Sequence, residues 1–427
     1  MDLKGLLIFG ALISQLACLS YGKIVLEVHH KYNGRKLMSL KAQKAHDAQR
    51  HGRGLSDVDL GVGGHVYKHG LYWTKLTIGT PPKEYYLHVD TGSYNIWLNC
   101  IDCEMCPKEA FGFQNILYDP KASTTSQKLL CGQGPCVLED KYADGSTMSG
   151  YFITDVLRFQ EVTADFHTAP SDAKIEIGCA RQEVPQGMKA SIGILGLSQQ
   201  PRSLISQLAQ QGKTKRVFSH CLDSEKGGGI FTIGELVEPK VNTTPLVSKD
   251  KDHYKVYMTG IDVDGEPLDI LSLKTGKGRE TFMDTGATRS YFPPVIYKQL
   301  MKNLTNRQPA LQLDPTIQDI CIPKTLKNVD EEFPTFTFHF ANSVPLTAHP
   351  HDYVYSENDK WCILLNSMDM DEPVIGDIFL SDKVVVYDLE NQTVGWTNDE
   401  YNCASHNIKV KDDKTGTAFS VGARNIS

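Results

Sequence analysis

The sequence lacks the features that mark a polytopic membrane protein or a general nucleic-acid binder. Beyond its N-terminus it has no apolar run of about 18 residues, which excludes a chain that crosses a membrane repeatedly with helices. It has no excess of basic residues either, because 44 Lys and Arg face 51 Asp and Glu, a net charge of −7. With 41% hydrophobic and 22% charged residues, wholesale disorder is also excluded. At about 150 residues per domain, 427 residues predict two or three domains or one large two-lobed unit.

The N-terminus has the pattern of a secretory signal peptide over residues 1–22. Lys4 precedes a largely apolar stretch from Gly5 to Leu19, and the small residues Ser20 and Gly22 favour a cut after Gly22. The alternative, a signal anchor, is disfavoured by the polar breaks in the stretch. We therefore expect a secreted or vacuolar protein. Residues 406–427 form a polar tail without a lipid-anchor signal, and Asn-x-Ser/Thr sequons stand at Asn242, Asn303, Asn391 and Asn425.

Cysteine usage fits an oxidising compartment. Ten of the eleven cysteines follow residue 22, and an even number suits disulfides. Cys100, Cys103 and Cys106 form a CxxCxxC run that would resemble a metal site in a cytosolic protein. After a signal peptide, we expect disulfides of this run with Cys131 and Cys136, although spacing leaves the connectivity open.

Residues 23–69 differ in composition from the remainder of the chain. Positions 1–69 carry a net charge of +5, against −12 for residues 70–427, and hold six of the fourteen histidines. A basic, His-rich segment before an acidic body predicts a propeptide held by charge. A solvated tail is the alternative interpretation.

Short strand patterns dominate the body and predict a mainly β architecture. The predicted helices are few: one covers Ser203–Gln210, with Gly212 as its stop, and another opens at Pro293 and Pro294. The predicted strands are Leu71–Ile78, Tyr85–Val89, Ile175–Ile177, Gly229–Ile233, Tyr254–Met258, Phe336–Phe340, Val384–Tyr387 and Thr393–Thr397.

The two halves of the body carry the same signals in the same order. Asp90-Thr91-Gly92-Ser93 follows one strand, and Asp284-Thr285-Gly286-Ala287 follows another. Each is followed by an apolar-apolar-Gly signal, Ile194–Gly196 in the first half and Val374–Gly376 in the second. This duplication predicts two pseudo-symmetric lobes, residues 70–240 and 241–405, with one Asp-Thr-Gly each.

Two carboxyl groups brought together across an interface suit acid–base hydrolysis of a peptide bond. Both cannot ionise easily, so the pair shares a proton over an acidic range. The ionised member takes a proton from a trapped water, and the protonated member donates a hydrogen bond to the carbonyl under attack. Gly92 and Gly286 allow tight turns, while the Thr91 and Thr285 hydroxyls can tie the two loops together.

The chain resembles the pepsin-like aspartic proteases, most closely the plant nucellin-type and aspartic-protease-like members, over about residues 23–427. The resemblance implies a bilobal β fold with the active-site cleft between the lobes, in proteins often made as zymogens. Besides the two Asp-Thr-Gly motifs, it rests on Ile78–Pro81, Trp97, Tyr142–Ser146, Ile194–Gly196, Phe218–Leu222, Val374–Asp377 and Val385–Gln392.

The resemblance also implies roles for individual residues. Asp90 and Asp284 match the catalytic dyad, and Ser93 matches the serine bonded to the first aspartate. Tyr142 matches the tyrosine of the flap over the cleft, and Trp97 matches its tryptophan partner. The Asp144-Gly145 pair independently favours a hairpin turn there. Such proteins use no metal and no cofactor, act on polypeptides as monomers, and this chain shows neither a membrane anchor nor a nucleic-acid site.

Two residues depart from the family pattern. Tyr94 follows the first motif where plant relatives usually have Asp, which alters the edge of the cleft. Ala287 follows the second motif where many members have Ser or Thr, so one hydrogen bond to Asp284 is absent and the pH optimum can lie nearer neutral than that of pepsin. The main alternative function is a catalytically weak or silent binding or inhibitor protein on the same fold. Because Asp90, Asp284 and Tyr142 are all present, we expect the secreted endopeptidase.

Overall fold

The computed structural model describes residues 24–30 and 72–421, the latter with short gaps. The predicted signal peptide, most of the predicted propeptide and the sequon at Asn425 lie outside the described residues. The gaps are 105, 107–108, 111–112, 115–116, 143–144, 165–166, 185–192, 225–227, 248, 271–272, 274–275, 315–318, 325–327, 399–400, 404–407 and 412–416.

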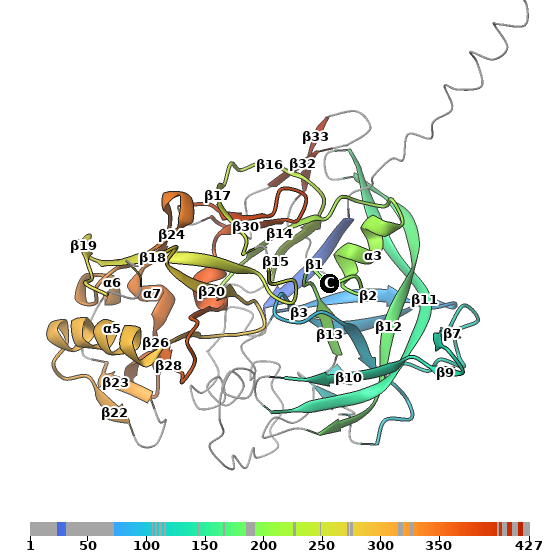
Figure 1. The fold of residues 1–427 in the computed structure, drawn as a ribbon, viewed down its shortest axis with the longest axis horizontal. Coiled ribbons are helices and arrows are strands. Elements are labelled where there is room, and N and C mark those ends of the chain that lie inside the picture. Colours follow the sequence, from blue (N-terminus) through green and yellow to red (C-terminus); the bar gives the residue numbers. More distant parts are fainter. Residues whose placement is uncertain are drawn as a thin grey trace, which may run out of the picture.

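The protein is a mainly β, two-lobed molecule whose largest sheet joins both lobes (Figure 1). Strands from the first half occupy one side of the molecule, strands and helices from the second half occupy the other, and a shared set of strands lies between them. In spatial order, the large sheet contains β10 (Val137–Lys141), β11 (Thr147–Ala164), β12 (His167–Val184), β4 (Ile96–Asn99), β13 (Gly193–Gly196), β3 (Lys83–Asp90), β2 (Tyr72–Ile78), β1 (Ile24–His30), β15 (Gly229–Ile233), β14 (Val217–Leu222), β30 (Val384–Asp388), β31 (Thr393–Trp396) and β17 (Asn242–Pro245), with β7 (Gln127–Lys128) beside β11.

The second half builds two further sheets, and a third closes the C-terminal side. One contains β25 (Val344–Ala348), β24 (Phe336–Phe340), β18 (Lys255–Val263), β20 (Arg279–Met283), β29 (Val374–Ile375), β21 (Ser290–Phe292) and β28 (Leu365–Ser367), with β19 (Glu266–Pro267) beside β18. The others contain β22 (Gln312–Asp314), β23 (Asp319–Pro323), β27 (Lys360–Ile363) and β26 (Val354–Glu357), and β16 (Leu236–Glu238), β32 (Ile408–Lys411) and β33 (Ala418–Val421). Two small hairpins are β5 (Glu109–Ala110) with β6 (Phe113–Gln114) and β8 (Leu130–Cys131) with β9 (Gly134–Pro135).

Few helices accompany the sheets. The helix predicted at Ser203–Gln210 begins one residue later, because Ser203 caps it and accepts a hydrogen bond from the Ser206 amide. The predicted stop, Gly212, takes a φ of 66° just past its end. Among the described residues, no helix is long and apolar enough to span a membrane. The helices are α3 (Leu204–Gln210), α5 (Pro294–Arg307), α6 (Val329–Glu332), α7 (Pro350–Tyr353) and α8 (Asp377–Leu380), with a 3-10 turn at Ala341–Ser343.

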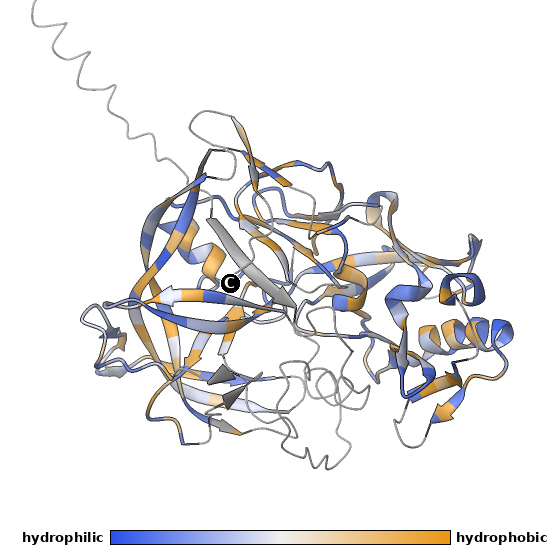
Figure 2. Ribbon diagram, turned by 180° about the vertical axis from the view of Figure 1, so that it is seen from behind, coloured by the Kyte–Doolittle hydropathy of each residue, from blue (hydrophilic) through white to orange (hydrophobic). Residues whose placement is uncertain are grey.

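Alternation of apolar and polar residues positions the strands around the core (Figure 2). In β18 and β24 alternate side chains are buried, and a single apolar core cluster draws on strands of both halves. The predicted strand at Ile175–Ile177 proved to be part of the 18-residue β12. Local propensity underestimated it because Pro170 and Asp172 are poor strand formers, whereas pairing with β11 along its whole length holds them extended.

Backbone pairing confirms the internal duplication. The strand before the first Asp-Thr-Gly, β3, pairs in parallel with β13, and the strand before the second, β20, pairs in parallel with β29. The glycine that ends each apolar-apolar-Gly signal is required by close packing. A Cβ at Gly196 would lie 2.4 Å from the Asn95 carbonyl oxygen, and one at Gly376 would lie 2.2 Å from the Arg289 carbonyl oxygen.

The predicted partners of the CxxCxxC run were wrong. Cys100 pairs with Cys179 on β12, Cys103 pairs with Cys106, and Cys131 pairs with its near neighbour Cys136. The reason is strand order. Strand β4 runs beside β12, which brings Cys100 to Cys179, whereas Cys131 lies in the separate two-stranded hairpin of β8 and β9. These sulfurs are not free thiolates for a metal. The remaining disulfides are Cys221–Cys403 and Cys321–Cys362.

Candidate active site

The two Asp-Thr-Gly loops meet where the lobes join. Asp90 ends β3 and Asp284 directly follows β20, and both side chains are almost completely buried. The loops touch at Gly92, where an added Cβ would lie 2.6 Å from the Asp284 Oδ1. Only a glycine admits the second carboxylate so close to the first loop, which explains this position of the motif.

The two threonines clasp the loops together reciprocally. The Thr91 amide donates to the Thr285 hydroxyl at 3.2 Å, and the Thr285 amide donates to the Thr91 hydroxyl at 3.0 Å. Each hydroxyl then donates across the interface, Thr91 to the Met283 carbonyl at 3.0 Å and Thr285 to the Val89 carbonyl at 3.1 Å. All these groups are buried, so this exchange of hydrogen bonds fixes the spacing of the two carboxylates.

Each carboxylate also accepts a hydrogen bond from its own loop, but the two loops are not equivalent. The Gly92 amide donates to the Asp90 Oδ1 at 2.9 Å, and the Gly286 amide donates to the Asp284 Oδ1 at 2.8 Å. The Ser93 hydroxyl donates in addition to the Asp90 Oδ2. Its counterpart Ala287 is fully buried and has no hydroxyl to offer.

Tyr142 and Trp97 are brought together as the sequence predicted. The Trp97 indole Nε1 donates to the Tyr142 hydroxyl at 2.7 Å. Tyr142 follows β10 at the start of a hairpin, which closes through the Tyr142 amide to the Ser146 carbonyl and the Gly145 amide to the Tyr142 carbonyl, each at 2.9 Å. Gly145 takes a φ of 84°, as expected of the Asp-Gly turn. Trp97 lies on β4, so the pair ties this hairpin to the strand that follows the first motif.

Sequence reasoning missed two buried aspartates that support the loops. Asp140 on β10 accepts two hydrogen bonds from the Asn95 Nδ2, at 3.0 Å and 3.1 Å. Asp319 on β23 accepts two from the Arg289 guanidinium, both at 3.0 Å. Burial raises the pKa of Asp140, and the bonds from Asn95 partly offset that rise. The available signal was positional, because Asn95 and Arg289 each lie five residues after the aspartate of a motif.

Comparison with known proteins accounts for this arrangement. The family model of eukaryotic aspartyl proteases matches residues 71–398. Two relatives from Arabidopsis thaliana, aspartic proteinase 36 and aspartic proteinase 39, are 40% and 41% identical, over 95% and 94% of this chain and 89% of each relative. Basic 7S globulin from soybean has the same fold, with a TM-score of 0.65 at 16% identity over 90% of this chain and 97% of that one. The chain belongs to the eukaryotic aspartyl protease family, whose members hydrolyse polypeptides as aspartic-type endopeptidases.

Proposed function

We propose that this protein is a secreted endopeptidase that works at acidic pH, with Asp90 and Asp284 as its catalytic pair. The observation that carries the proposal is the reciprocal clasp of Thr91 and Thr285, which holds two buried carboxylates at the junction of the lobes. Two buried carboxyl groups in contacting loops favour a shared proton, which is consistent with work at acidic pH.

The asymmetry of the loops suggests which carboxyl plays which part. Hydrogen bonds from Ser93 and the Gly92 amide stabilise the charged form of Asp90. Asp284 has no hydroxyl from Ala287, so the shared proton is better placed on Asp284. In this assignment Asp90 accepts a proton from the attacking water, and Asp284 donates a hydrogen bond to the carbonyl oxygen of the scissile peptide. The proton that Asp90 has taken from the water then passes to the leaving amine as the peptide C–N bond breaks, which completes hydrolysis.

Tyr142 acts as a positioning residue at the rim of the site. Its hydroxyl accepts a hydrogen bond from Trp97, which holds the ring in one orientation for contact with a bound peptide. Secretion is supported by five disulfides, which persist in oxidising compartments, together with the signal pattern at residues 1–22.

Residues 23–69 act in this proposal as a propeptide that remains attached by more than charge. Strand β1 lies within this segment and pairs with β15 from Ile24 to Val28 and with β2 from Val28 to His30. Lys and Arg keep their charge in acid while carboxylates lose theirs, so acidification weakens the electrostatic hold. The backbone ladder of β1 does not titrate, and we expect that strand to stay in place.

The peptidase is tested with protein secreted from a eukaryotic host. Acid-treated protein should cleave denatured haemoglobin or casein between about pH 3 and 6, and pepstatin should block the cleavage. Failure to cleave either substrate anywhere in this range would instead support the silent binding protein.

The propeptide is tested by placing a site-specific protease sequence near residue 60 and cutting the folded precursor. The uncut form should show a lag that acid shortens, whereas the cut form should start at full rate with β1 still bound. Equal initial rates of the two forms at every pH would contradict an inhibitory role.

A further inference from the structure

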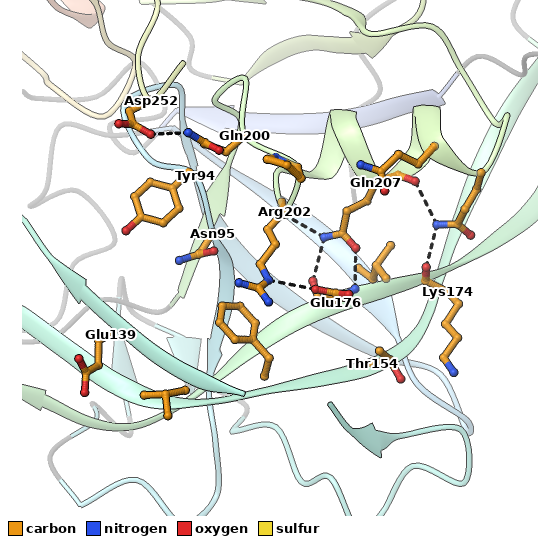
Figure 3. A pocket seen from close by; sticks show the side chains of 16 residues that line it. Tyr94, Asn95, Glu139, Thr154, Lys174, Glu176, Gln200, Arg202, Gln207 and Asp252 are labelled. Carbon is orange, nitrogen blue, oxygen red and sulfur yellow. Dashed lines mark hydrogen bonds and ion pairs between the residues drawn. The ribbon is translucent and has the colours of Figure 1, made fainter. Parts of the chain in front are cut away.

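The residue that departs from the family pattern after the first motif, Tyr94, lies at the edge of a pocket on the flank of the first lobe (Figure 3). Tyr94 directly follows Ser93, which contacts the Asp90 carboxylate, so the pocket starts one residue from the site. The pocket measures about 790 Å³ and extends between β10, β11, β12 and α3. Tyr94 is 39% exposed, so its ring is accessible to a ligand in the pocket.

The Tyr94 end of this pocket is electronegative. Burial, and then the charges of Asp140 and Asp252, raise the pKa of Tyr94 to about 12. Asp252 lies beyond the ring on one side, where it accepts a hydrogen bond of 2.6 Å from the Gln200 Nε2. Glu139 lies on the other side, on the exposed face of β10. An exposed aromatic ring is therefore flanked by carboxylates.

The cations that line the pocket do not neutralise this end. The Arg202 Nε pairs with the Glu176 Oε2 at 3.0 Å, and its guanidinium lies 4.1 Å from the centre of the Phe152 ring. The Lys174 Nζ donates to the Gln127 Oε1 at 3.1 Å, on the neighbouring strand β7. The Arg202 charge is thus engaged by Glu176, and Lys174 lies at the far side of the pocket from Tyr94 (Figure 3).

We propose that this pocket binds a lysine or arginine side chain of the polypeptide substrate, a few residues from the scissile bond. The aliphatic stem would lie on the Tyr94 ring, and the cation would lie between Glu139 and Asp252. Cation–aromatic contact and charge pairing reinforce each other here, because both favour the same group. The proposal rests on the peptidase function and names a class of substrate for it.

Peptides that differ at one position test the pocket. In an otherwise uncharged substrate, a single lysine is moved through successive positions on both sides of the scissile bond, and each peptide is compared with its norleucine counterpart. We expect one or two adjacent positions where lysine raises kcat/KM by about 2- to 5-fold, the effect of a cation on an exposed aromatic ring. The double variant E139Q/D252N should lower that ratio towards 1, and Tyr94→Ala should lower it in part.

The matched control removes the same charge elsewhere on the lobe. Glu104 and Asp172 are exposed and lie outside the pocket, so E104Q/D172N should keep the wild-type lysine preference. An equal loss in the two double variants would show a long-range field and overturn the pocket. Cleavage of the norleucine peptides with no gain for lysine at any position overturns the pocket and leaves the peptidase, whereas no cleavage of any peptide overturns both.

Salt gives a second readout. The lysine preference should weaken as added salt screens the exposed carboxylates. A preference that stays the same between low and high salt would contradict charge recognition.

Discussion

The first and second halves of the molecule support their Asp-Thr-Gly loops with the same geometry but different charge. Five residues after Asp90, Asn95 holds the buried Asp140 through both carboxylate oxygens. Five residues after Asp284, Arg289 holds the buried Asp319 in the same manner. One support is a neutral amide on a carboxylate, and the other is a buried ion pair.

The two supports also differ in the structural elements that carry their aspartates. Asp140 lies on β10, two residues before Tyr142, so the neutral support leads into the hairpin beside the site. Asp319 lies on β23, which the Cys321–Cys362 disulfide joins to β27. The second support is stabilised by the permanent charge of Arg289 and by a disulfide, whereas the first depends on a carboxyl group that can take up a proton. We infer that the support beside the Tyr142 hairpin deforms more easily than the support in the second half.

The largest expected effect is a loss of activity that is the same for the catalytic residue of either half. Asp90→Asn and Asp284→Asn should each lower kcat by about 10³-fold or more, because neither carboxyl role can be filled by an amide. Thermal unfolding should stay near the wild-type temperature, since the amides keep the shape. Retention of near-full turnover by either variant would remove that residue from the mechanism.

The next effect separates the halves by stability. Arg289→Met leaves Asp319 as a buried charge without its cation and should cost about 3–5 kcal/mol of unfolding free energy. Asn95→Leu should cost only about 1–3 kcal/mol, because it removes hydrogen bonds but no ion pair. Denaturant titration of both variants measures the contrast. Equal losses would show that the charge of Arg289 adds nothing to its support.

A third change concerns the hairpin, which only the first support carries. Tyr142→Ala should lower kcat/KM by about 10- to 100-fold, because a misplaced lid residue no longer positions the peptide. Trp97→Phe removes the indole donor to the Tyr142 hydroxyl while keeping an aromatic ring, and should cost less. Unchanged kinetics of Tyr142→Ala on several peptides would place it outside the site.

A smaller change restores symmetry between the loops. Ala287→Ser supplies the second loop with the hydroxyl that Ser93 gives the first. Because a new donor favours the charged carboxylate, the profile of kcat/KM against pH should move to lower pH, by about one unit at most. Ser93→Ala should move it in the opposite direction. Shifts of the same sign in both variants would contradict the proposed division of roles.

The smallest effect tests the neutral support itself. Burial raises the pKa of Asp140 in the folded protein, so its contribution to stability is fully present below the unfolded value near 3.8 and is lost as pH rises through the folded value. Asp140→Asn removes this loss, and its melting temperature relative to wild type should therefore climb as pH increases from about 4. The exposed Asp172→Asn serves as control. A difference that is flat with pH would refute the titration of Asp140.

Local patterns predicted the features that depend on neighbouring residues. The Asp-Thr-Gly turns, the end of α3 at Gly212 and the turn at Gly145 each follow from a few adjacent side chains. The duplication was also readable, because both halves repeat the same signals in the same order. Sequence alone therefore located the candidate site and the fold that carries it.

Long-range pairing set the limit of that prediction. The partner of Cys100 depended on β4 lying beside β12, which spacing along the chain does not reveal. The supports of Asn95 and Arg289 reach aspartates 45 and 30 residues away, which carry no motif of their own. The place of β1 between β2 and β15 was hidden for the same reason, since a short strand at the start of a basic segment has no local signal for its partners.

The pairing of β14 with β30 has a consequence for how the chain is made. Leu222 ends β14 and Val384 begins β30, so 162 residues separate the two strands. At about 5–20 residues per second, a ribosome needs roughly 8–30 s to supply the missing neighbour. During that interval the first half is nearly complete but presents an unpaired sheet edge, the kind of surface on which nascent chains associate. Throughout that interval the completed first half keeps one sheet edge open until β30 has been made.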